Sequence, residues 1–286
     1  MIIDGHAHVF SSKIITNVSA KSALVNRLHL QTSQARGRKN VSVLQEEGRA
    51  SGVKACLILP TANVAEIKKV NNEFMEMAVL SDFLFTAGTL HPRFEANRKE
   101  LLRMQSRGVR AIKLCSFSQG FSLAEPETQY LLKLIEEINS LHGGNFFVIL
   151  DTFYLAHEYF GTPAKHTTTP FLLGNIIKAN PEINFVAAHM GGLAAPPEEI
   201  FKHLPPLKNL YLDTSNAAHT LSERDFLRLL ELHGPGHVFF GTDWPWFGHE
   251  GELELISQLL DKAGFNGEEK NKVFCENIAG LLGIQT

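Results

Sequence analysis

The chain has 286 residues, of which 44% are hydrophobic and 20% charged, and its formal net charge is −3 at pH 7. A chain of this length can bury one large core or two smaller ones. The charge balance excludes the basic footprint of a nucleic-acid-binding protein, and the sequence has no run of about 20 apolar residues that could span a membrane. Three scattered cysteines and the absence of a signal-peptide pattern predict a cytoplasmic protein with reduced thiols.

Short, almost continuously apolar runs recur along the chain, as expected for strands buried on both faces of a parallel sheet. They lie at residues 1–4, 53–59, 84–90, 109–115, 145–151, 183–189, 209–215 and 237–243. Between them, amphipathic segments predict helices at residues 65–81, 125–141 and 222–233, and a closing helix is expected at residues 267–283. Ser222, three residues before Asp225, is placed to cap its helix.

The alternation of eight strands with helices predicts an α/β fold, a TIM-like (β/α)8 barrel that forms a single domain over residues 1–286. A doubly wound open sheet is the alternative, but no glycine-rich phosphate motif supports it. Residues 11–47 form a long insertion after the first strand and have no strand of their own. Such an insertion could be a lid over the catalytic end or a solvated surface excursion, and the sequence leaves both open.

The first strand, in MIIDGHAHVF, carries Asp4, His6 and His8. Because side chains alternate along a strand, these three are expected on one face. Two imidazoles on one face at the end of a strand are placed to share a metal ion. This pattern favours a metal site over a pair of structural, hydrogen-bonded histidines.

Polar residues also stand at the ends of other apolar strands, where the active site of a parallel barrel is built. Asp151 ends strand five, His189 ends strand six, and Asp243 ends strand eight within GTDWPW. For Asp243 the pattern favours a ligand or general-base role over a helix cap. For His189 it favours a functional role over a place in the core. Asp151 could be a metal ligand, a partner for Lys113 or a helix cap.

Lys113 on strand four would be costly to bury unpaired, so it either has a chemical role or extends to the strand end. Cys115 follows it on the same strand. On strand seven, Asp213 and Ser215 are expected to be structural or to support the site from behind. Three aromatic residues near Asp243 are expected to wall a pocket, namely Trp244, Trp246 and Phe247.

The segments MIIDGHAHVF, GVRAIKL, FVAAHMGG, GTDWPW and ENIAGLLGI together resemble the amidohydrolase superfamily. The most similar branch is the amidohydrolase-2 group, which includes the aminocarboxymuconate-semialdehyde decarboxylase-like enzymes, and the resemblance runs from residue 1 to about residue 284. It implies a barrel with one divalent metal, commonly zinc. His6 and His8 match the first two metal ligands. Asp243 matches the aspartate that binds metal and handles the proton of the activated water, and His189 matches the acid/base or substrate-orienting histidine.

The chain departs from this family at the end of strand five, where a histidine ligand is usual and Asp151 stands instead. The expected ligands are therefore His6, His8, Asp151 and Asp243, a set that can hold zinc and raises the preference for manganese or iron. His157 or His166 from the following loop are alternative ligands. Lys113 resembles the strand-four lysine that some superfamily members carry as a metal-bridging carbamate, but no carbamate is expected here.

The leading hypothesis is a metal-dependent hydrolase of a small amide, ester or lactone, with Asp243, His189 and Lys113 as the catalytic residues. Lys113 or an arginine such as Arg93 could contact a substrate carboxylate. The first alternative is a non-oxidative decarboxylase of a small unsaturated or aromatic carboxylic acid. The second is a catalytically degenerate barrel that only binds a ligand, which the replacement at Asp151 favours. The expected partner is a small-molecule substrate, not nucleic acid or a membrane, and a homo-oligomer is compatible with the sequence.

Overall fold

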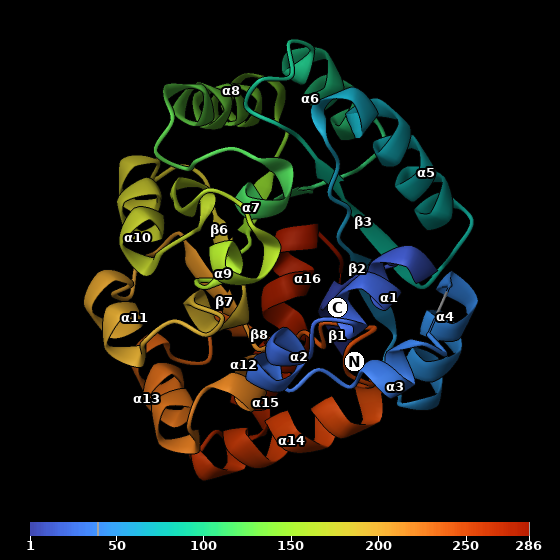
Figure 1. Cartoon of the computed structure of the whole chain (residues 1–286), viewed down its shortest axis with the longest axis vertical. Coiled ribbons are helices and arrows are strands. Elements are labelled where there is room, and N and C mark those ends of the chain that lie inside the picture. The colour runs from blue at the N-terminus through green and yellow to red at the C-terminus, as the bar shows by residue number, and fades with distance from the viewer. Residues whose placement is uncertain (39, 286) are drawn as a thin grey trace.

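The computed structural model describes residues 1–38 and 40–285, and in this part of the chain eight parallel strands follow one another in sequence order (Figure 1). Almost every strand residue is buried, as the continuous apolar runs predicted. All eight predicted strands are found: β1 (Ile3–Ala7), β2 (Ala55–Ile58), β3 (Leu84–Thr89), β4 (Ala111–Leu114), β5 (Phe147–Leu150), β6 (Phe185–Ala187), β7 (Leu210–Asp213) and β8 (Val238–Phe239).

Helices surround these strands as a ring (Figure 1). The ring comprises α4 (Val41–Ala50), α5 (Ile67–Val79), α6 (Asn97–Ser106), α8 (Pro126–His142), α10 (Pro170–Ala179), α11 (Pro197–His203), α13 (Glu223–His233) and α14 (His249–Lys262). The helices predicted at 65–81, 125–141 and 222–233 are α5, α8 and α13. The Ser222 side chain caps α13 by accepting a hydrogen bond from the Asp225 N–H at 3.2 Å. None of the described helices is long and apolar enough to cross a bilayer.

Shorter helical turns follow several strands: η1 (Val64–Glu66), α7 (Ser116–Gln119), α9 (Ala156–Phe160), η2 (Ala164–His166), η3 (His189–Gly191) and α12 (Ala217–Thr220). The predicted closing helix at 267–283 is α15 (Gly267–Asn271), a π-helical turn (Lys272–Glu276) and α16 (Asn277–Leu282). Apolar side chains of α16 pack against the inward-facing strand residues, such as Ile3 and Phe147. In Figure 1, α16 lies at the centre of the ring. It therefore closes one end of the barrel, opposite the carboxyl ends of the strands.

Backbone hydrogen bonds between the first strand and the segment that follows β8 close the ring of strands. The Gly5 N–H donates to the Phe240 carbonyl at 2.9 Å, and the His8 N–H donates to the Trp244 carbonyl at 2.7 Å. Between them, the Asp243 N–H donates to the His6 carbonyl at 2.9 Å. The predicted (β/α)8 barrel is confirmed. Its closing seam holds the histidine-bearing strand directly against the segment that carries Asp243.

An extra residue in β1 decides which way its polar side chains point. Asp4 pairs with Cys56 on β2, but Ala7 pairs with Ile58, so β1 uses three steps where β2 uses two. This bulge reverses the alternation of side chains. Asp4 consequently points outward, where its Oδ2 lies 3.1 Å from His249 Nε2 on α14. The expectation that Asp4 shares a face with His6 and His8 is therefore wrong.

The insertion after β1 is helical and packed against the body of the protein. It contains α1 (Ser12–Ser19), α2 (Ser22–Leu28) and α3 (Thr32–Ala35) and then leads into the ring helix α4. Ile15, Leu24 and Leu28 join a buried apolar cluster with Phe153 and Trp246, which follow β5 and β8. Of the two possibilities left open by the sequence, the solvated excursion is excluded, because this segment covers the carboxyl ends of the strands.

Candidate metal centre and active site

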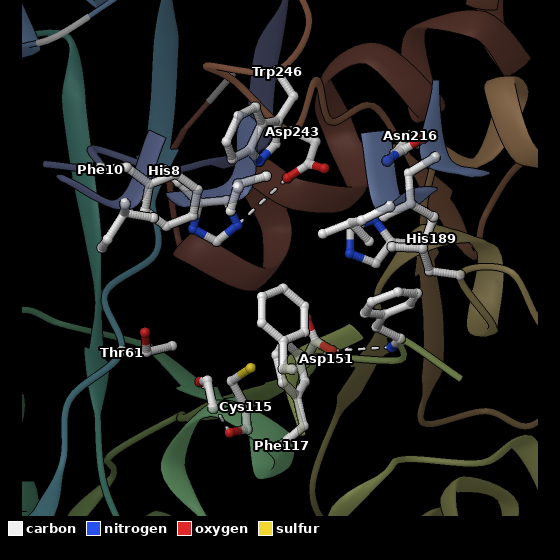
Figure 2. A pocket seen from close by; sticks show the side chains of 18 of the residues that line it. His8, Phe10, Thr61, Cys115, Phe117, Asp151, His189, Asn216, Asp243 and Trp246 are labelled. Carbon is white, nitrogen blue, oxygen red and sulfur yellow. Dashed lines mark hydrogen bonds and ion pairs between the residues drawn. The ribbon is translucent and has the colours of Figure 1, made fainter. Parts of the chain in front are cut away.

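A cavity of about 480 Å³ opens at the carboxyl ends of the strands (Figure 2). Its polar lining includes most of the residues singled out from the sequence: His8, Lys113, Cys115, Asp151, His189 and Asp243. These residues come from five different strands or strand ends. The barrel therefore brings together side chains that lie far apart in the chain, at the place where parallel barrels build their active sites.

His6, His8 and Asp243 form a compact group of possible metal ligands. The Nε2 atoms of the two histidines lie 3.1 Å apart. Asp243 Oδ1 lies 3.5 Å from His8 Nε2 and 4.0 Å from His6 Nε2. Two nitrogens bound to one zinc ion at about 2.0–2.1 Å are separated by about 3.3 Å in tetrahedral geometry. The three side chains therefore fit around one divalent ion.

The hydrogen bonds of the two histidines fix which nitrogen carries the proton. His6 Nδ1 donates to Asp213 Oδ2 at 2.8 Å, and His8 Nδ1 donates to the Leu59 carbonyl at 3.0 Å. In the neutral rings both Nε2 atoms are then unprotonated, so two lone pairs face each other at 3.1 Å. Only a shared cation, a metal ion or a proton, relieves this repulsion. Burial lowers the pKa of His8 well below its ordinary value, which disfavours the proton.

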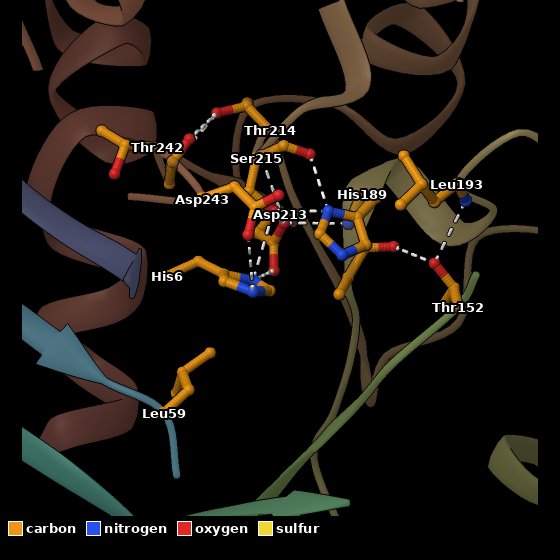
Figure 3. Close-up of polar contacts among 12 residues, drawn as sticks. His6, Leu59, Thr152, His189, Leu193, Asp213, Thr214, Ser215, Thr242 and Asp243 are labelled. Atoms are coloured by element: carbon orange, nitrogen blue, oxygen red, sulfur yellow. Dashed lines mark hydrogen bonds and ion pairs between the residues drawn. The ribbon is translucent and has the colours of Figure 1, made fainter. Parts of the chain in front are cut away.

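Asp213 is the polar centre behind the site (Figure 3). Besides His6 Nδ1, it accepts hydrogen bonds from the backbone N–H groups of His189 at 2.9 Å and Ser215 at 3.2 Å, and from the Ser215 hydroxyl. Burial alone would raise the pKa of Asp213, but the His6 imidazole and these hydrogen bonds hold it well below its usual range. The sequence suggested a supporting role for Asp213 and Ser215, and their contacts with His6 are of that kind.

His189 lies beside His6, with ring centroids 4.9 Å apart. Its Nδ1 donates to the Ser215 carbonyl at 2.8 Å, which leaves Nε2 as a hydrogen-bond acceptor. Burial lowers the pKa of His189 to about 4, so the ring is neutral at pH 7. In this tautomer His189 can accept a proton from a bound molecule. It cannot donate a hydrogen bond to a substrate oxygen until it has taken up that proton.

Three residues of the site adopt left-handed backbone conformations that non-glycine residues rarely use. They are His189 at φ 56°, Asn216 at φ 54° and Asp243 at φ 60°, which follow β6, β7 and β8. Strained backbone of this kind clusters at functional sites. Asn216 was not singled out from the sequence, although asparagine is the residue that best tolerates this conformation. Its buried amide lies beside Asp243 and makes no hydrogen bond within the described residues.

Lys113 and Asp151 line the same cavity but stand apart from the three-ligand group. Lys113 is 1% exposed, and its Nζ has no hydrogen-bond partner among the described residues. Asp151 Oδ1 accepts a hydrogen bond from the Phe153 N–H at 3.0 Å, a turn-type contact that turns one oxygen of the carboxylate toward its own backbone. The Asp243 pKa is raised by burial, while nearby Lys113 opposes this, and a cation at the site would favour the charged carboxylate.

Several residues considered from the sequence lie outside this cavity. Arg93 is half-exposed and pairs with Glu125 at 3.0 Å, so it does not contact the cavity. His157 and His166 are also absent from the cavity lining. Of the three aromatic residues after β8, only Trp246 lines it.

The other two aromatic residues turn away because they have structural partners. Trp244 is fully buried and donates its indole N–H to Glu47 Oε2 at 3.0 Å. Phe247 stacks on His219 with ring centroids 4.1 Å apart. The expectation that both would wall the pocket is therefore wrong. Apolar residues of α1 and α2, which the sequence did not single out individually, take this place instead.

The chain matches the model of the amidohydrolase family over residues 3–284 and belongs to that family, whose members are metal-dependent enzymes. No curated protein sequence matches it. Among solved structures, an uncharacterised TIM-barrel protein of Bordetella bronchiseptica is similar, with a TM-score of 0.75 and 18% identity over 99% of this chain and 98% of that one.

Two further similar structures are described by an activity. A 5-carboxyvanillate decarboxylase of Novosphingobium aromaticivorans, complexed with manganese, has a TM-score of 0.71 and 14% identity over 99% of this chain and 96% of that one. A Pseudomonas putida protein provisionally assigned as a 2-pyrone-4,6-dicarboxylic acid hydrolase has a TM-score of 0.64 and 19% identity, covering 100% and 98% of the two chains. At these identities the likeness shows the shared barrel fold. The reaction has to be argued from the site itself.

Proposed function

We propose that this protein is a metal-dependent hydrolase of a small amide, ester or lactone. The observation that carries the proposal is that the Nε2 atoms of His6 and His8 face each other at 3.1 Å with Asp243 beside them, while Asp213 and the Leu59 carbonyl hold the two Nδ1 atoms. This arrangement is repulsive without a shared cation. His6, His8 and Asp243 would hold the ion. When bound, a divalent metal supplies an activated water near neutral pH and polarises a substrate carbonyl.

The surrounding residues support proton transfer and substrate binding. Asp243 lies within reach of the same point as the two histidines and is suited to take a proton from the attacking water. His189 presents an unprotonated Nε2 to the cavity, which suits it to accept a proton and then return it to the leaving group. Lys113 offers a buried ammonium to a developing oxyanion or to a substrate carboxylate. Asp151, whose Oδ1 accepts a hydrogen bond from the Phe153 N–H, would be the fourth ligand through its second oxygen.

A decarboxylase on the same scaffold is the second candidate. The observation in its favour is that, among the described residues, Lys113 is the one lysine or arginine that lines the cavity, whose walls are mainly apolar side chains such as Phe117, Phe153 and Leu193. A carboxylate held between these walls loses most of its hydration, which favours cleavage of its bond to the substrate carbon and release of neutral carbon dioxide. The electron pair left on that carbon would take up a proton from solvent or from a protonated side chain of the site. Structures with this fold include both decarboxylases and a proposed hydrolase, so fold does not separate the two candidates.

The test begins with the metal. We expect about one equivalent of zinc, or of manganese or iron, in the purified protein by elemental analysis, and its loss in His6→Ala. His237→Ala, which changes a histidine outside the cavity, is the matched control and should keep the metal. A panel of esters, lactones, amides and carboxylic acids, with acid release and carbon dioxide release followed separately, then distinguishes hydrolysis from decarboxylation. A protein that takes up no metal after soaking contradicts both candidates and supports the degenerate barrel.

A further inference from the structure

The cavity has two chemically different parts. Its floor carries the polar groups around Lys113, His189 and Asp243. Its mouth is largely apolar and is built in part by the insertion after β1. Ile14 and Val18 of α1 and Leu24 and Leu28 of α2, with Leu30, line it together with Phe160, Leu193 and Trp246. The polar side chains that also line the cavity away from Lys113 are the uncharged hydroxyls of Thr61, Ser118 and Thr162. Hydrolysis of a small polar molecule would need the floor alone, so the mouth requires its own explanation.

Some of the mouth residues expose apolar surface to solvent. Ile14 is 43% exposed and Phe160 is 36% exposed, although both line the cavity. Neither belongs to the buried core of the cluster that holds the insertion in place, whose buried members include Ile15 and Leu28. Packing of the insertion therefore does not account for the orientation of Ile14, whereas Phe160, on α9, packs on Phe117 with ring centroids 5.2 Å apart. When an apolar group of a ligand covers apolar surface around an opening, the free energy of the complex is lowered.

The charges in the cavity restrict the ligand further. Among the cavity-lining residues in the described ranges 1–38 and 40–285, Lys113 is the one lysine or arginine. Its Nζ is buried without a hydrogen-bond partner, so it is available to one anionic group at the floor. Among the described residues, no lysine or arginine belongs to the mouth lining. Lys21 lies next to it, with its Nζ 5.6 Å from the Phe160 ring, but it donates to the Tyr159 carbonyl at 2.9 Å, so a second anionic group would be desolvated and would compete with that carbonyl.

We propose that the site takes amphipathic monoanions, in which one carboxylate or equivalent anionic group lies at Lys113 and an apolar alkyl or aryl body fills the mouth formed by α1 and α2. In this arrangement, Ile14 and Val18 determine specificity by contacting the apolar body, and Lys113 positions the head group next to His189 and Asp243. Turnover of these molecules rests on the proposed function, whereas their binding does not depend on it.

Binding of simple probes tests this directly. Calorimetric titration of the metal-loaded protein with straight-chain monocarboxylates from butanoate to decanoate should give affinities that rise two- to fourfold with each added CH2, as burial of one methylene predicts. Octanedioate should bind at least about tenfold more weakly than octanoate, because its second carboxylate would enter the apolar mouth unpaired. Equal affinities across the series, or tighter binding of octanedioate, would overturn the proposal.

Two variants assign the preference to its residues. Ile14→Asp should weaken octanoate binding by tenfold or more and leave butanoate binding within about twofold. Val79→Asp, a change at an apolar residue that is 71% exposed outside the cavity, is the matched control and should bind both as the wild type does. An Ile14→Asp protein that keeps wild-type octanoate affinity would refute the role of the mouth.

The lysine is tested with a charged and an uncharged probe. Lys113→Met should lose tenfold or more of its affinity for octanoate but keep that for octanamide, which also shows that the variant folds. Unchanged octanoate affinity would mean that the head group does not lie at Lys113, and this part of the proposal would fail. A protein that binds octanoate by this pattern but hydrolyses no ester, lactone or amide disproves the function alone. One that turns over short polar substrates without chain-length preference disproves the substrate class alone.

Discussion

The hydrogen bond between Asp213 and His6 provides the most direct test of the candidate metal centre. In Asp213→Asn, the amide oxygen can keep the hydrogen bonds from the backbone N–H groups of His189 and Ser215. Its NH2 group then faces His6 Nδ1, which in the wild-type protein lies 2.8 Å from Asp213 Oδ2. Because two donors cannot share this contact, the His6 proton has to move to Nε2, and the lone pair that faces His8 is lost.

The expected loss is tenfold to hundredfold in metal affinity, or about 1.4–2.7 kcal/mol, as for other residues that orient metal-ligating histidines. The assay is a competitive zinc titration against a fluorescent chelator, with circular dichroism to show that the variant is folded. The matched control is Asp225→Asn, because Asp225 accepts hydrogen bonds from Ser222 and Arg224 on α13, away from the cavity. If Asp213→Asn binds zinc as tightly as the wild type, the tautomer argument is refuted.

Three further variants test other parts of the structure. Ser222→Ala removes the cap of α13 and should lower the free energy of unfolding in urea by about 1 kcal/mol. Burial lowers the pKa of His233 to about 4, so between pH 6.5 and 4 the unfolded chain binds a proton that the folded chain does not. His233 alone should therefore lower the free energy of unfolding by up to about 3 kcal/mol as the pH drops through this window. In His233→Leu the urea midpoint should fall less than in the wild type over the same range, and the remaining fall comes from His189 and His8, whose pKa values burial also lowers. In Gly241→Ala, the new Cβ would lie 2.7 Å from His6 Cβ, so metal content should drop, whereas Gly236→Ala, which meets open space, should keep it. A pH profile in His233→Leu as steep as that of the wild type, or full metal content in Gly241→Ala, would contradict these arguments.

Much of the fold could be predicted from local patterns in the sequence. A strand buried on both faces needs continuous apolar residues, so runs such as 145–151 and 183–189 located β5 and β6 directly. The barrel followed from their regular alternation with helices such as α8. The polar residues His189 and Asp243 stood out because they end otherwise apolar runs. The cavity brings both together with His8, as the carboxyl ends of parallel strands require.

Other features depend on contacts that local patterns do not record. The bulge in β1 that turns Asp4 outward is visible only in the pairing of β1 with β2. The bond between Asp213 and His6 joins residues 207 positions apart. Asn216 could have been noticed as a residue that tolerates the left-handed conformation, but its conformation is set by the turn after β7. The apolar mouth was missed because the leucines of α1 and α2 carry no catalytic signature.

The two sides of the closing seam, β1 and the segment after β8, are synthesised at different times on the ribosome. His6 and His8 are synthesised long before the backbone partners that hold β1 in place, Phe240 and Trp244, which follow β8. A nascent chain that stops after β7 has two unpaired strand edges, which are open to pairing with other chains. It also lacks Asp243, so the candidate metal trio is incomplete. An ion bound by His6, His8 and Asp243 would thus fasten the first strand to the last, and its capture would mark the completed barrel.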